Sequence, residues 1–229
     1  MNDNRFIKRE IHVEGLQLRE QGDNPNLRTI EGTAIVFNSP SATLWETEKV
    51  RVREVISPSA ITREFLDQCN IVLTMFHDNT LVLGRSKNGK GTLAYNVSAT
   101  GVSFVCDIDV TTDVGKRAIS MIERGDIDGC SFAFSADYWD PQYVLKNEVK
   151  VGEKVERTYT VIKMDAVYDM TITPNPAYPA TACNTRDLEM FRSLCELETE
   201  KESHEDEKAN EELERAYQER MLKSKPFWE

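Results

Sequence analysis

Alternating apolar and polar residues recur along the chain before residue 186, and this pattern predicts a protein built mainly from β-strands. In the segment 10–19, apolar residues nearly alternate with polar ones on either side of Gly15. Apolar, β-branched and aromatic residues are also concentrated in seven further segments: 30–37, 50–56, 71–76, 93–97, 102–108, 130–136 and 157–162. So many strands predict a closed or strongly curled antiparallel barrel.

Two helices are expected to interrupt the strands. Ser57 can cap the first, Pro58 suits its first turn, and the residues that follow place apolar side chains on one face. The second is expected from about residue 112 to 124, with Gly125 placed to end it. The predicted fold class is therefore α+β but mainly β: a barrel with flanking helices. The polar span 139–157 is expected to be an excursion between two strands.

The composition changes near residue 186. From Glu196 onward acidic residues are dense, and neither glycine nor proline occurs until Pro226. We therefore expect two parts, a folded domain over 1–185 and an acidic tail over 186–229 that is helical or partly disordered. The tail is either a solvated extension or a docking segment that recruits the protein into an assembly.

Charge and composition exclude several classes of function. The net charge of −11 argues against a nucleic-acid partner, because phosphate binding needs clustered lysine and arginine. No apolar run is long enough to span a membrane, and the first residues lack the apolar core of a secretory signal, so a cytoplasmic protein is expected. The five cysteines are scattered and only three histidines are present, which predicts neither a metal site nor a cofactor.

His77 and Ser131 are the candidate chemical groups of the predicted sheet. His77 closes an apolar, strand-like run, and Ser131 lies near the start of another. A serine hydroxyl becomes a nucleophile when an imidazole removes its proton. The alternatives are a strand-end histidine bonded to backbone and a small packed serine. Cys130 is a competing nucleophile, and because adjacent strand residues face opposite sides, only one of Cys130 and Ser131 can face His77.

Short motifs in a fixed order carry a resemblance to a known family. They include Phe76-His77-Asp78 and Ser131-Phe-Ala-Phe134. The full collinear set lies at 31–37, 54–61, 76–78, 83–85, 91–93, 101–102, 125–127, 131–134 and 174–180. Together these segments resemble the prohead maturation serine proteases of tailed phages, over most of residues 28–183. That family is distantly similar in fold to the herpesvirus assemblin proteases.

The resemblance implies roles for the candidate residues. Ser131 would be the nucleophile that forms an acyl-enzyme, His77 its general base, and Cys130 a variable apolar position. The third catalytic residue would be Asp169, which stands where related sequences carry glutamate. Less favoured substitutes are Asp78, Asp137, Glu148 and Asp165. Assemblins use a second histidine, but neither His12 nor His204 lies at a comparable place. Arg85 would lie near the substrate, hold an oxyanion water or form a structural ion pair.

The resemblance also implies a biological setting. The enzyme would act inside the immature capsid in the bacterial host cytoplasm, cleave the major capsid protein and its scaffold segment, and cleave itself, with removal of the tail. It could also self-associate. Two alternatives remain: an inactive assembly protein with a protease-like fold, and a hydrolase that depends on Cys130.

Overall fold

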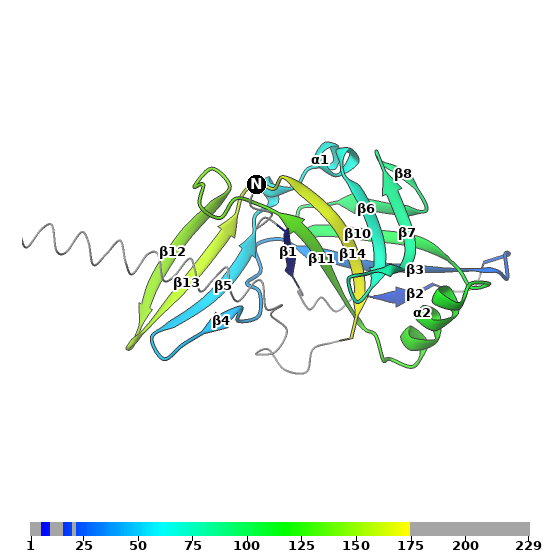
Figure 1. The fold of residues 1–229 in the computed structure, drawn as a ribbon, viewed down its shortest axis with the longest axis horizontal. Coiled ribbons are helices and arrows are strands. Elements are labelled where there is room, and N and C mark those ends of the chain that lie inside the picture. Colours follow the sequence, from blue (N-terminus) through cyan, green and yellow to red (C-terminus); the bar gives the residue numbers. More distant parts are fainter. Residues whose placement is uncertain (1–5, 10–15, 20–21, 175–229) are drawn as a thin grey trace, which may run out of the picture. The chain divides into compact units, whose positions relative to one another are not determined.

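The structure is a computed structural model that describes residues 6–9, 16–19 and 22–174. These residues form three β-sheets, two α-helices and one short 3-10 helix (Figure 1). The predicted acidic tail, together with His12, His204, Cys183 and Cys195, lies outside the described residues. Across the part of the chain that is described, no helix has the length and apolar character needed to cross a membrane.

The largest sheet has six strands in the order β1, β11, β14, β6, β7, β8. Their bounds are Phe6–Arg9, Gly129–Ser135, Ala166–Thr173, Asn70–Met75, Asp78–Lys87 and Lys90–Gly91. β14 and β6 run parallel, and every other neighbouring pair runs antiparallel. Every residue of β11 is buried. A strand that is buried on both faces has no solvent-exposed face for polar residues, which explains why apolar and polar residues do not alternate along β11.

Two four-stranded sheets complete the architecture. One has the order β2, β3, β10, β9, with bounds Gln17–Leu18, Leu27–Val36, Gly101–Asp109 and Leu93–Val97. The other has the order β12, β13, β5, β4, with bounds Val144–Val151, Lys154–Val161, Val50–Ile56 and Trp45–Glu46. In this second sheet β13 and β5 run parallel.

The predicted closed or strongly curled antiparallel barrel is wrong. The described strands form three separate sheets, and none of these is closed. A barrel closes only when the two edge strands of one sheet pair with each other. The edge strands of the three described sheets are β1 and β8, β2 and β9, and β12 and β4, and within each sheet these two strands are not neighbours. Alternation reports which face of a strand is buried, but it does not report which strands pair. The expectation of a mainly β fold with few helices is confirmed.

The first predicted helix is two shorter elements. Ser57 caps a 3-10 helix over Pro58–Ala60, and Thr62 then caps α1, Arg63–Gln68, by accepting a hydrogen bond from the backbone N–H of Phe65. The second helix, α2, spans Asp113–Glu123, close to its predicted bounds. Thr112 caps it, and Gly125 follows its end with a φ of 75°, a conformation that suits glycine.

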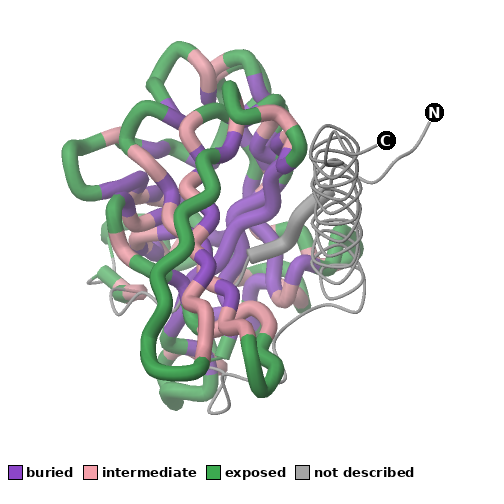
Figure 2. The backbone as a smooth tube through the Cα atoms, turned by 90° about the vertical axis from the view of Figure 1, so that its left-hand side faces the viewer, coloured by how far each residue is buried: buried purple, intermediate pink, exposed green. Residues whose placement is uncertain are grey.

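The polar span 139–157 contains most of a β-hairpin rather than an irregular excursion. β12 and β13 pair antiparallel across a turn that contains Gly152, whose φ is 65°. β12 is exposed along nearly its whole length, and in Figure 2, viewed from the side of β12, buried segments lie behind an exposed strand. Because both faces of β12 meet solvent, its sequence carries little alternation.

Candidate active site

A strained two-residue turn places His77. β6 ends at Met75, β7 begins at Asp78, and these two residues pair directly, so Phe76 and His77 form the whole connection. Both have positive φ, 57° and 55°. A two-residue hairpin turn with two positive φ values is usually Asn-Gly or Asp-Gly, since such a conformation costs a bulkier residue about 1–2 kcal/mol. Phe76 and His77 must therefore be held there by other contacts.

Strand β14 supplies those contacts. The backbone N–H of Phe76 donates to the carbonyl oxygen of Ile172 at 3.1 Å, and that of His77 donates to the hydroxyl of Thr171 at 3.0 Å. The Thr171 hydroxyl in turn donates to the carbonyl oxygen of Thr74 at 2.9 Å and accepts from the Thr74 hydroxyl at 2.9 Å. Thr171 thus ties the end of β6 and the histidine turn to its own strand. Thr171 is not among the residues predicted from the sequence, because nothing local marks it.

Thr171→Val should loosen the histidine turn. Valine keeps the shape of threonine but leaves the N–H of His77 and the hydroxyl of Thr74 without their buried acceptor, which costs about 1–3 kcal/mol of unfolding free energy. We expect a lower urea midpoint and slower substrate cleavage at temperatures where the variant is still folded. Thr171→Ser, which keeps the hydroxyl, is the matched control. Unchanged stability and turnover in the valine variant would contradict this role.

Neighbouring strands bring Ser131 and Asp169 together. In the register of β11 and β14, Ser131 lies opposite Thr171 and Ala133 lies opposite Asp169. Directly paired residues share a face of the sheet, as do residues two apart on one strand. Ser131 and Asp169 are therefore diagonal neighbours on one face.

The imidazole of His77 bridges these two side chains. Its Nε2 is 2.9 Å from the Ser131 Oγ, and its Nδ1 is 2.8 Å from the Asp169 Oδ1. With the proton on Nδ1, the ring donates to the carboxylate and accepts from the serine hydroxyl. All three residues are buried. A nucleophile bonded to a base that is itself bonded to an orienting group is the arrangement that activates a serine.

Cys130 has a different environment from its neighbour Ser131. Its Sγ packs against β3, where a Cβ added to Gly32 would lie only 2.9 Å from the sulfur. This places the thiol on the opposite face of β11, toward the interior between the two sheets. Burial raises the pKa of the Cys130 thiol to about 12, so the nucleophilic thiolate is disfavoured at neutral pH.

The four alternative carboxylates have local roles. Asp78 accepts from the backbone and hydroxyl of Thr80, and Asp137 accepts from the backbone of Trp139. Glu148 forms ion pairs with Arg157 and Lys146, and Asp165 is exposed just before β14. The carboxylate within hydrogen-bond distance of the imidazole is that of Asp169, whose side chain is long enough to reach Nδ1.

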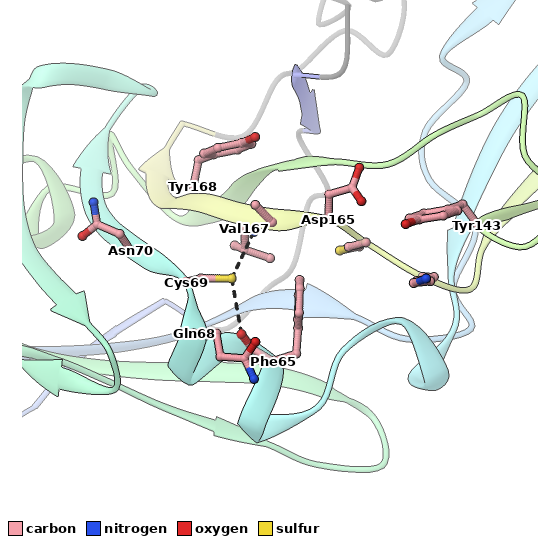
Figure 3. A pocket seen from close by; sticks show the side chains of 11 residues that line it. Phe65, Gln68, Cys69, Asn70, Tyr143, Asp165, Val167 and Tyr168 are labelled. Atoms are coloured by element: carbon pink, nitrogen blue, oxygen red, sulfur yellow. Dashed lines mark hydrogen bonds between the residues drawn. The ribbon is translucent and has the colours of Figure 1, made fainter. Parts of the chain in front are cut away.

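Arg85 and a large cavity both lie near the start of β6, whereas His77 follows its end. The Arg85 guanidinium donates to the Asn70 side-chain oxygen at 2.7 Å, which is a structural contact. The cavity, of about 600 Å³, lies between the end of α1 and the starts of β6 and β14 (Figure 3). There the Cys69 thiol donates to the carbonyl oxygen of Phe65 and accepts from the N–H of Val167. Neither Arg85 nor this cavity belongs to the hydrogen-bonded cluster of His77, Ser131 and Asp169.

Comparison with known proteins identifies the chain at the level of its family. The family model described as caudovirus prohead serine protease matches residues 14–193, which include all three residues of the hydrogen-bonded cluster. Comparisons with curated proteins and with solved structures gave no match. Since the matched region covers most of the sequence, the chain belongs to the caudovirus prohead serine protease family.

Proposed function

We propose that this protein is a serine endopeptidase that processes capsid and scaffold proteins during prohead maturation, with Ser131 as nucleophile, His77 as general base and Asp169 as the residue that orients the imidazole. Family membership provides the coarser part: a serine peptidase of the phage prohead, within the host, whose substrates are capsid proteins. The assignment of residues is supported by one observation, the hydrogen-bonded series from Asp169 through His77 to Ser131.

The chemistry follows from this geometry. As the Ser131 oxygen attacks the peptide carbonyl carbon, Nε2 takes the hydroxyl proton and the carbonyl oxygen gains the negative charge. Collapse of the tetrahedral intermediate breaks the carbon–nitrogen bond, and His77 returns the proton to the leaving amine. A water molecule, deprotonated by the same imidazole, then cleaves the acyl-enzyme. No step requires a cofactor.

Asp169 has two tasks in this mechanism. It accepts the Nδ1 proton, which keeps Nε2 free to accept a proton from serine, and it stabilises the imidazolium that forms. The carboxylate and the imidazole ring are both buried. Their interaction is therefore stronger than it would be in water, because charges separated from water attract each other more strongly than exposed ones.

Self-cleavage is a further part of the proposal. The abrupt change of composition near residue 186 supports a division into a protease domain, 1–185, and an acidic tail, 186–229, with a cleavage site near that boundary. The boundary lies outside the described residues.

Co-expression with the major capsid protein tests the function. We expect the capsid protein to lose its scaffold segment and the protease to lose its tail, both visible as defined mass differences in intact-protein mass spectrometry. If the capsid protein and the protease both stay at full length with the wild-type chain, an assembly role without catalysis is favoured. If the capsid protein is trimmed while the tail persists, self-cleavage at the boundary is rejected and the protease assignment stands.

A further inference from the structure

Strand β11, which carries Ser131, has a neighbour on each side in the six-stranded sheet. On one side lies β14, and on the other lies β1, Phe6–Arg9 (Figure 1). β1 runs antiparallel to β11, from Phe6 opposite Ser135 to Arg9 opposite Phe132. The described part of β1 therefore stops one register position short of Ser131. An extended segment that kept this register for one more residue would pass directly beside the serine.

The two sides of Ser131 differ in what they contribute. Asp169 is on β14, and His77 follows β6, the next strand beyond it. The base and its orienting carboxylate thus both approach from the β14 side. An incoming peptide carbonyl must approach from elsewhere, and the neighbour within the sheet on the other side is β1. Neighbouring strands lie about 4.8 Å apart, so a peptide paired with β11 there is within reach of the serine side chain.

Access to the nucleophile is closed in this structure. Ser131 is fully buried, and every other residue of β11 is buried as well. Peptides recognised by strand addition need a free sheet edge with unpaired N–H and carbonyl groups. On the side away from the histidine, β1 pairs with residues 132–135 of β11, so a peptide can pair with this stretch only after β1 has left.

We propose that this edge of β11 is the substrate-binding site, that it takes a polypeptide segment as an extended antiparallel strand, and that β1 is an internal occupant which competes with the substrate. This rests on the proposed function of Ser131. β1 suits such a role because, within the part of the chain that the structure describes, it has four residues and pairs on one side alone. A tethered segment competes at an effective concentration of roughly millimolar order, so β1 slows cleavage of dilute substrate.

A reversible cross-link between β1 and β11 tests the proposal. Phe6 and Ser135 are directly opposed, four register positions from Ser131. Opposed residues in antiparallel strands have Cα atoms about 4.5–5.5 Å apart, a separation that a disulfide can span. The double variant Phe6→Cys/Ser135→Cys would be oxidised with diamide or reduced with dithiothreitol. Trimming of purified major capsid protein would then be timed in both states. The two single variants, treated alike, are the controls.

We expect the oxidised double variant to trim the capsid protein at least about tenfold more slowly than its reduced form, because a tethered strand then cannot leave. The single variants should show equal rates in both states. Equal rates for the oxidised and reduced double variant would overturn the proposal and leave the serine protease function intact.

A binding measurement separates this inference from the proposed function. In a Ser131→Ala background, the capsid protein should bind to the reduced double variant and lose most of that binding on oxidation. If binding switches in this way but no Ser131 form of the protein trims the capsid protein, the binding edge stands and the protease function fails. If neither binding nor trimming depends on oxidation, the binding edge is rejected.

Discussion

Ser131→Ala should abolish trimming of the major capsid protein, with kcat/KM reduced by about 10⁴-fold or more. The substitution removes the atom that would form the acyl-enzyme, and the neighbouring thiol is not placed to replace it. Cys130, the adjacent residue, packs on the opposite face with its thiol protonated. The measurement is the rate of appearance of the shortened capsid protein, with intact-protein mass as the readout.

Cys130→Ala is the matched control for this experiment. It changes the neighbouring residue of the same buried strand by a similar volume but leaves the Ser131–His77 hydrogen bond in place. We expect it to lose some stability through a small cavity and to retain its cleavage rate. Trimming at the wild-type rate in Ser131→Ala would reject the serine mechanism, and loss of trimming in Cys130→Ala alone would favour a thiol hydrolase.

Asp169→Asn should lower kcat by about 10⁴-fold while the fold persists. Asparagine has nearly the shape of aspartate, but it carries no charge to stabilise the imidazolium. Its amide nitrogen can also donate a hydrogen bond to Nδ1, which favours the imidazole tautomer that carries its proton on Nε2. In that tautomer Nε2 cannot accept the proton of the serine hydroxyl. Capsid cleavage under substrate saturation reports kcat, and urea denaturation with circular dichroism checks the fold.

Asp165→Asn controls for the loss of one negative charge near the same strand. Asp165 is exposed just before β14, so its substitution should leave kcat unchanged. A kcat for Asp169→Asn equal to that of Asp165→Asn would show that His77 works without a carboxylate. Asp169→Ala, which removes the side chain altogether, should be as slow as Asp169→Asn if the charge is what matters.

The sequence by itself located eight of the fourteen described strands and both helical regions, but not β1, β4, β7, β8, β12 or β14. The prediction for 50–56 coincides with β5, and that for 93–97 coincides with β9, because alternation and β-branched residues are local signals. The caps at Ser57 and Gly125 were also readable, since each depends on residues within one turn. Ordered motifs around His77 and Ser131 were sufficient to identify the family, because a collinear set of short motifs is unlikely to arise by chance.

Pairing between strands was decided only by the tertiary structure. The expected barrel failed because alternation is the same whether a strand joins a closed barrel or an open sheet. The resemblance favoured Asp169 among five carboxylates, but its 2.8 Å contact with the imidazole depends on the register of β11, β14 and β6. Thr171, which is 94 residues from His77 in the sequence, gave no local signal at all. Local patterns set the elements and the chemical groups, whereas non-local packing set which groups meet.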